Sequence, residues 1–153
     1  NIQRIGVQSA EQMYEASKNL FDHCDIAILS AAVADFKPKS VPLSKIKKED
    51  GLEQIELMPT VDILKSLGSI KNKQILIGFA LETTNEVENA IKKLKSKNCD
   101  AIILNSLQES GAGFQHDTNK ISIIDKSLKI EDFPLKSKAL VAVDICDFIQ
   151  KKI

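Results

Sequence analysis

The chain has 153 residues, 43% of them hydrophobic, and its 21 basic and 21 acidic side chains give a formal net charge of zero. This length suits one domain, residues 1–153, with a modest core and no second full domain. A neutral chain has no overall field to attract nucleic acid or an anionic membrane, and Arg4 is its only arginine. We therefore expect neither a nucleic acid nor a membrane as partner.

The cysteines and histidines indicate neither a disulfide framework nor a metal centre. Cys24, Cys99 and Cys146 are odd in number, widely separated and without C-x-x-C spacing, and His23 and His116 have no partner at ligand spacing. We therefore expect a reducing, cytoplasmic compartment. The chain starts at an asparagine within a strand-like run, which we interpret as the start of an internal fragment.

The first third of the chain predicts strand, helix and strand. Residues 3–8 alternate like a strand, and Ser9 with Gln12 three positions later forms the pattern of a capping box before an amphipathic helix. Residues 26–33 are almost continuously apolar, as expected of a parallel strand that is covered on both faces.

The next segment interrupts this alternation. Polar and apolar residues alternate on both sides of Asp50-Gly51, which predicts an antiparallel hairpin within residues 41–59. A short helix is expected to follow, with Thr60 or Asp62 near its start and Gly68 at its end.

The rest of the chain returns to alternating strands and helices. We predict strands over 74–82, 100–105 and 120–125, a helix over 85–96, and a closing helix over 132–152. This order indicates an α/β layered fold with a mainly parallel sheet and one antiparallel hairpin excursion.

Polar residues follow three of these strands where ligands of such sheets bind, at the carboxyl ends. Asp35 lies beyond the second strand and is either a metal or ribose ligand or the polar end of a buried strand. Glu82 and Thr83 follow the next strand, where Thr83 either contacts a ligand or caps the following helix, and Asn105 follows the one after.

Lysines are concentrated in two places. Lys93 and Lys97 are four apart on one predicted helical face, where they either meet phosphates or are simply solvated. The second group of lysines lies near Asp35. These lysines either bind a nucleoside triphosphate with Mg²⁺ or protect a hairpin edge from aggregation. They fall within twelve positions close to Asp35: Lys37, Lys39, Lys45, Lys47 and Lys48.

Four segments, in this order and spacing, resemble the phosphopantothenate–cysteine ligases of the bacterial CTP-dependent type, also called phosphopantothenoylcysteine synthetases: "SAAVADFKPK", "KIKK", "IGFALET" and "DAIILN". The resemblance implies a homodimer with a Rossmann-like three-layer core. It also implies coupling of 4′-phosphopantothenate to cysteine in coenzyme A biosynthesis, with CTP and Mg²⁺, through an acyl-cytidylate. FMN is implied only if a decarboxylase domain is fused upstream.

Site residues follow from the resemblance position by position. Lys45, the first lysine of "KIKK", would act in the activation step, and Asp35 would contact Mg²⁺ or the nucleotide. The segment Thr60-Val61-Asp62-Ile63 departs at two positions from the usual Asn-Pro-Asp-Ile. The implied nucleotide contacts are Leu29, Ser30, Ala31, Asp35, Lys45, Val61, Asp62, Ile63, Leu64, Phe79, Lys93 and Lys97. Asn105, Gly113, Phe114 and Asp117 would only shape the site.

The family's amino-terminal half has no counterpart in this sequence, including a segment whose asparagine acts on the acyl-nucleotide. We therefore expect the carboxyl-terminal part of a ligase domain, inactive alone. Two other hypotheses stay open, a nucleotide-binding module without chemistry and a purely structural dimerisation domain. An oxidoreductase is disfavoured because the dinucleotide fingerprint G-x-G-x-x-G is absent.

Overall fold

The computed structural model describes residues 2–42, 44–47, 54–106 and 116–152, and the fold is built around a five-stranded sheet in the order β1-β4-β5-β7-β8. The strands β1 (Ile26–Leu29), β4 (Ile75–Glu82) and β5 (Ala101–Ser106) are parallel. The strands β7 (Ile121–Asp125) and β8 (Ile130–Asp132) add antiparallel pairs. The predicted α/β fold with a mainly parallel sheet is confirmed.

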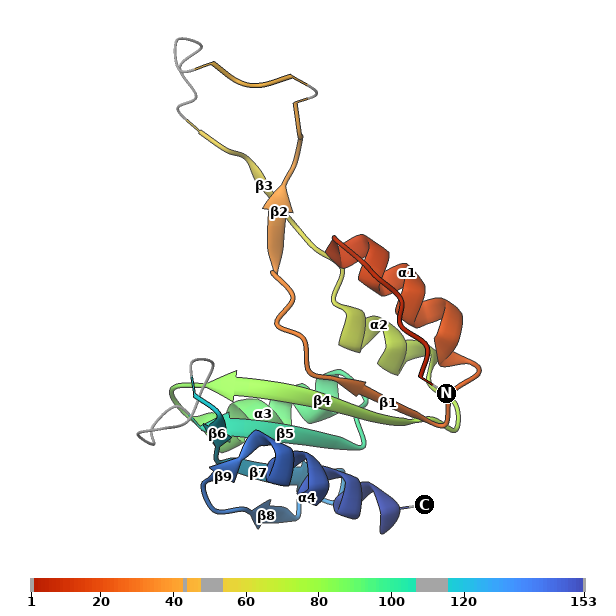
Figure 1. Cartoon of the computed structure of the whole chain (residues 1–153), viewed down its shortest axis with the longest axis vertical. Coiled ribbons are helices and arrows are strands. Elements are labelled where there is room, and N and C mark those ends of the chain that lie inside the picture. Colours follow the sequence, from red (N-terminus) through yellow and green to blue (C-terminus); the bar gives the residue numbers. More distant parts are fainter. Residues whose placement is uncertain (1, 43, 48–53, 107–115, 153) are drawn as a thin grey trace.

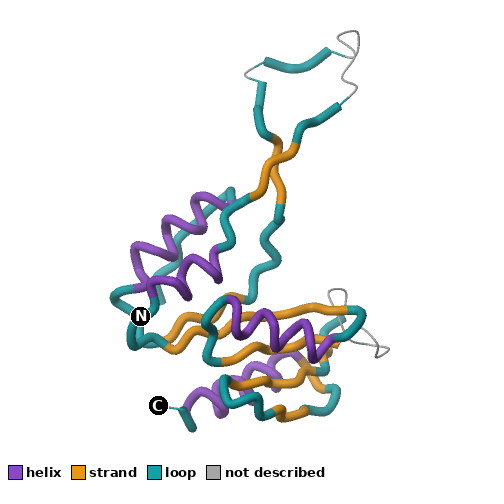
Figure 2. The backbone as a smooth tube through the Cα atoms, turned by 180° about the vertical axis from the view of Figure 1, so that it is seen from behind, coloured by secondary structure: helices purple, strands orange, loops and turns teal. Residues whose placement is uncertain are grey.

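Helices cover the two faces of the sheet, so the fold has three layers. The helices α1 (Ala10–Phe21), α2 (Ile63–Ile70) and α3 (Glu86–Ser96) belong to one face, where their side chains join those of alternate strand residues in one core. The helix α4 (Lys138–Gln150) packs on the opposite face. Figures 1 and 2 show α3 and α4 on opposite sides of the sheet.

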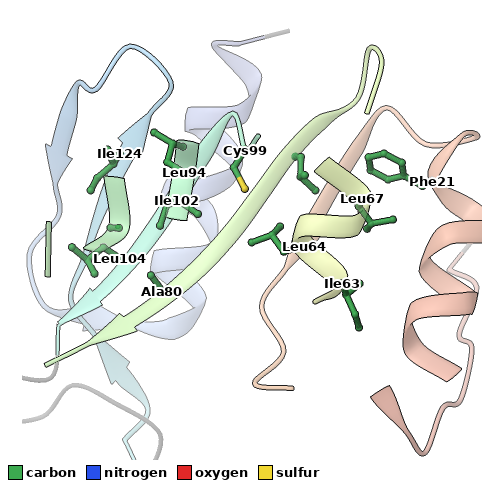
Figure 3. Close-up of a cluster of buried hydrophobic side chains, with 12 residues drawn as sticks. Phe21, Ile63, Leu64, Leu67, Ala80, Leu94, Cys99, Ile102, Leu104 and Ile124 are labelled. Atoms are coloured by element: carbon green, nitrogen blue, oxygen red, sulfur yellow. The ribbon is translucent and has the colours of Figure 1, made fainter. Parts of the chain in front are cut away.

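Two buried clusters hold these layers together. Figure 3 shows the first, in which Leu64 and Leu67 of α2 lie between α1 and the sheet. Gly78 of β4 leaves the space that Leu64 fills, because a Cβ atom added there would lie 2.5 Å from a Leu64 methyl carbon. In the second cluster, Val141, Ile145 and Ile149 of α4 cover the other face.

Several local predictions are confirmed. The hydroxyl of Ser9 accepts a hydrogen bond from the Gln12 N–H at 3.2 Å and so caps α1. Of the two predicted starts of α2, Asp62 is the N-cap residue. The strand β4 and the helix α3 lie within a residue or two of their predicted ranges.

An antiparallel hairpin excursion is also confirmed, but its ladder is shorter than predicted and lies at the base, and its first strand precedes the predicted range 41–59. The strands β2 (Phe36–Pro38) and β3 (Leu57–Pro59) pair antiparallel, and the described residues between them form no strand. The predicted turn at Asp50-Gly51 lies outside the described residues. We call residues 36–59 the arm, whose described parts project from the sheet in Figure 1.

The strand predicted for residues 3–8 is wrong. This segment forms no strand, and its side chains are mostly exposed. Alternation gives a strand only where a neighbouring strand supplies hydrogen bonds, and no described strand pairs with this segment. The strand predicted over 26–33 is shorter for a similar reason, since pairing with β4 ends at Leu29.

Three predicted helix boundaries differ from those in the structure. Gly68 does not end α2 but lies inside it, and a residue without a Cβ atom is needed there because such an atom would meet the Lys97 carbonyl oxygen. Asn85, not Thr83, is the N-cap residue of α3, in the left-handed conformation that asparagine tolerates. The closing helix begins only at Lys138, capped by Ser137, because Asp132 belongs to β8 and residues 136–137 pair as a short strand instead.

Three minor features complete the description. The short strands β6 (Thr118–Asn119) and β9 (Lys136–Ser137) pair antiparallel beside the start of α4. All three cysteines are free thiols, with Cys99 buried and Cys146 exposed. A search of the described part of the chain finds no helix with the length and apolar character needed to span a membrane.

Candidate functional site

A cavity of about 570 Å³ opens where β1 ends, between α1, α2, α3 and the sheet. Every residue that the resemblance places at the nucleotide, except Lys45, lines this cavity. These lining residues come from the end of β1 and the residues after it, from the start of α2, from β4 and from α3. They are Leu29, Ser30, Ala31, Asp35, Val61, Asp62, Ile63, Leu64, Phe79, Lys93 and Lys97. Residues far apart in sequence therefore meet at one edge of the sheet.

The chain leaves β1 along one side of this cavity and is anchored there by Thr60. The Thr60 hydroxyl donates to the carbonyl oxygen of Ala34 at 2.5 Å, and the Thr60 N–H donates to that of Asp35 at 2.9 Å. These two hydrogen bonds hold the backbone at Ala34 and Asp35 in place, and the Asp35 side chain is exposed. Sequence reasoning placed Thr60 only near a helix start and missed this role.

The carboxylate of Asp62 makes two separate contacts. Its Oδ1 atom accepts from the Lys65 N–H at 3.0 Å, and its Oδ2 atom accepts from the ammonium group of Lys97 at 2.7 Å. Burial raises the pKa of Asp62, but the hydrogen bonds from Lys97 and Lys65 outweigh burial and lower it overall. Asp62 is therefore ionised at neutral pH and joins the start of α2 to the end of α3.

Lys93 projects from α3 toward the sheet. Its ammonium group donates to the carbonyl oxygen of Phe79 at 2.9 Å. Desolvation, followed by the positive charge of Lys97, lowers the pKa of Lys93, and the charges of Glu82 and Asp62 partly oppose this effect. An anion bound in the cavity would favour the charged form of Lys93.

The described lysines of the arm do not line the cavity. Lys45 is exposed on the arm and is absent from the cavity lining. Lys37 forms an ion pair with Glu11, and Lys39 forms one with Glu56 at 2.9 Å. Lys48 lies outside the described residues. Of the described lysines in the predicted cluster, Lys37, Lys39 and Lys45 therefore do not line the cavity beside Asp35, and the role of Lys45 stays a prediction.

Asn105 lies on the other side of the same sheet edge. It lines a second cavity of about 320 Å³ with Ser30 and Phe79, which belong to both cavities. Its side-chain oxygen accepts from the Asn119 amide at 2.9 Å. Gly113 and Phe114 lie outside the described residues, and the Asp117 carbonyl oxygen accepts from the Lys138 N–H at 2.9 Å.

The cavity also has a wall that the sequence did not indicate. Met13 and Ser17 from α1 and Cys24 from the turn after it are among the residues that line it. Burial raises the pKa of the Cys24 thiol, with Asp25 adding to this effect, so Cys24 is a neutral thiol at neutral pH. The helical pattern of α1 indicates core packing, and nothing in it distinguishes residues facing a cavity from residues filling the core.

The described carboxylates do not form a metal centre on their own. No group of three or more His, Cys, Asp or Glu side chains in this part of the chain has the geometry to hold a metal ion. Asp35 supplies one exposed carboxylate at the cavity. A single carboxylate fits Mg²⁺, which commonly keeps its waters and completes its coordination with substrate phosphates.

Comparison with known proteins gives a family match over the whole chain. A family model described as the DNA/pantothenate metabolism flavoprotein C-terminal domain matches residues 1–153. A crystal structure of the C-terminal domain of the coenzyme A biosynthesis bifunctional protein CoaBC has a TM-score of 0.78 and 39% sequence identity. That match covers 97% of this chain and 66% of the other.

Two curated relatives carry different names. The chain is 48% identical over 141 residues to the coenzyme A biosynthesis bifunctional protein CoaBC of Bacillus subtilis (strain 168), covering 92% of this chain and 35% of that protein. It is 56% identical over 146 residues to a cysteine/cysteine sulfinic acid decarboxylase of an unknown prokaryotic organism, covering 95% of this chain and 41% of that protein. The chain thus spans less than half the length of either relative.

Proposed function

This chain belongs to the family of DNA/pantothenate metabolism flavoprotein C-terminal domains, and we propose that it is the nucleotide-binding part of a phosphopantothenate–cysteine ligase. The observation that carries the proposal is the cavity at the end of β1. It gathers from four elements the residues that the ligase pattern places at the nucleotide, with Lys45 as the exception.

We propose CTP, 4′-phosphopantothenate and cysteine as the substrates. The carboxylate of 4′-phosphopantothenate attacks the α-phosphorus of CTP and pyrophosphate leaves, which gives the acyl-cytidylate. The cysteine amine then attacks the acyl carbon, loses a proton, and CMP leaves as the amide bond forms. Such phosphoryl transfer depends mainly on positioning and charge neutralisation, which a rigid sheet edge and nearby cations provide.

The residues of this chain take distinct parts in this proposal. The backbone of Leu29, Ser30 and Ala31 lines the nucleotide, and Phe79 packs against it. Lys93 and Lys97 neutralise the phosphates, and Lys45, delivered by the arm, assists activation. Asp35 would hold Mg²⁺, which would screen the phosphate charge. The choice of CTP over ATP rests on the resemblance alone.

A second candidate is a nucleotide-binding or dimerisation module without chemistry of its own. One observation favours it, namely that this family segment is shared with a protein whose name describes a decarboxylase and not a ligase. Such a module would contribute binding or assembly to a larger enzyme. A nucleotide-binding module would bind nucleotide without ever releasing pyrophosphate, whereas a dimerisation module would bind no nucleotide.

Pyrophosphate release separates the two candidates. We expect the chain alone to release none from Mg–CTP, because the residues that complete the ligase site are absent from it. A hybrid in which the chain follows the amino-terminal half of a bacterial ligase domain should release pyrophosphate only when 4′-phosphopantothenate is present. A folded hybrid that binds CTP and releases no pyrophosphate would favour the non-catalytic module.

We also propose that the chain forms a homodimer through the arm. Phe36 is 59% exposed and Leu57 is 60% exposed, although both are large apolar residues on a two-stranded ladder, which is marginally stable by itself. A second copy would cover these side chains. Sedimentation velocity should therefore show a dimer that Phe36→Ser converts to monomer, while Leu135→Ser outside the arm leaves it intact. A monomeric wild-type chain would contradict the proposal.

A further inference from the structure

The ion pair between Asp62 and Lys97 joins two helices at the candidate nucleotide cavity. Asp62 is the N-cap residue of α2 and Lys97 is the C-cap residue of α3, and both line the cavity. Both carboxylate oxygens of Asp62 already have partners within the chain, Lys65 N–H and the Lys97 ammonium group. Asp62 therefore needs no ligand to satisfy it.

The charges of the described side chains that line this cavity sum to zero. Among its described lining residues, the positive charges of Lys93 and Lys97 are matched by the negative charges of Asp35 and Asp62. Lys93 is already engaged by the carbonyl oxygen of Phe79. An incoming anion therefore meets no net positive charge, and the ammonium group of Lys97 is shared with a fixed carboxylate.

We propose that Asp62 is an internal counter-ion that holds Lys97 until a phosphate group of the ligand displaces it. This inference rests on the proposed nucleotide site and refines it, because Asp62 then limits anion affinity and does not contact the nucleotide. Binding exchanges one ion pair for another, while the cap on α2 stays in place through the separate bond from Lys65. Asp62 is in this sense a positioning residue for Lys97.

Asp62→Asn tests the proposal without removing the helix cap, because asparagine caps helices about as well as aspartate. We expect Mg–CTP to bind up to about fivefold more tightly, since a partly exposed ion pair contributes up to about 1 kcal/mol. Calorimetric titration measures this change. Unchanged circular dichroism and thermal midpoint would show that α2 is intact.

Two further variants separate release of Lys97 from a general loss of negative charge. In a Lys97→Gln background, Asp62→Asn should no longer tighten binding, because no ammonium group is left to release. Glu88→Gln removes the same charge from α3 and breaks the ion pair with Lys92, yet Glu88 does not line the cavity. Its affinity for Mg–CTP should equal that of the wild type.

Each alternative outcome has a definite meaning. If the wild type binds Mg–CTP and Asp62→Asn binds equally or more weakly, the counter-ion role is wrong while the proposed site stands. A gain that persists in the Lys97→Gln background would also overturn it, because repulsion by Asp62 would then act without Lys97. If neither folded form binds, the proposed site fails and the counter-ion role fails with it.

Discussion

Gly68→Ala is expected to destabilise the chain by about 3 kcal/mol, the upper range for overpacking a well-packed core. A Cβ atom at this position would lie 1.9 Å from the carbonyl oxygen of Lys97, which is backbone and cannot rotate away. The Asn98 side chain also donates to the Gly68 carbonyl oxygen at 2.8 Å, so the two segments are held in close contact. Chemical denaturation of the variant and the wild type measures the loss.

The consequence extends to the site, because Lys97 follows α3 at this contact. Relief of the clash requires α2 and the end of α3 to separate, which would lengthen the 2.7 Å contact between Asp62 and Lys97. Gly6→Ala is the matched control, since a Cβ atom there has no neighbour within 4 Å, and its stability should equal that of the wild type. A Gly68→Ala variant as stable as this control would contradict the packing of α2 against α3.

Lys45→Ala is expected to abolish selective binding of Mg–CTP and, in a complete hybrid ligase, the release of pyrophosphate. The charges of the described lysines and carboxylates that line the cavity sum to zero. A triphosphate therefore needs additional positive charge, which Lys45 would supply. Lys45 is exposed on the arm, so the substitution costs no buried contact. Calorimetry measures binding, and a pyrophosphate assay measures activation.

Lys73→Ala provides the control, because it removes the same charge from an exposed residue that precedes β4, at the opposite end of that strand. It should bind Mg–CTP with the wild-type affinity. If Lys45→Ala binds and reacts like this control, Lys45 has no role at the nucleotide, and the lysines of the arm serve only to keep a hairpin edge solvated.

Much of the fold was predictable because local signals and tertiary packing agree. The Ser9 cap, the apolar run of β4 and the amphipathic pattern of α3 each depend on neighbouring residues in the sequence, and each is confirmed. The segment 3–8 has an equally regular pattern but no described strand beside it, so it forms no strand. Gly68 was misplaced because its neighbour, Lys97, is distant in sequence and only the folded chain brings the two together.

The candidate site was likewise predictable from the sequence only in part. Ser30, directly after β1, was predictable because ligands bind where parallel strands end, and Phe79 within β4 was predictable because the family pattern names its position. The ion pair between Asp62 and Lys97 was not, because it depends on how α2 packs against α3. Lys45 is absent from the cavity lining because it belongs to the arm, whose described parts extend from the sheet (Figure 1), and no spacing rule indicates this.

Calorimetric titration of the chain with Mg–CTP and, separately, with Mg–ATP tests the nucleotide site most directly. The proposal predicts saturable binding of Mg–CTP in preference to Mg–ATP by a chain whose circular dichroism shows it to be folded. A folded chain that binds neither nucleotide would contradict a nucleotide site at the end of β1.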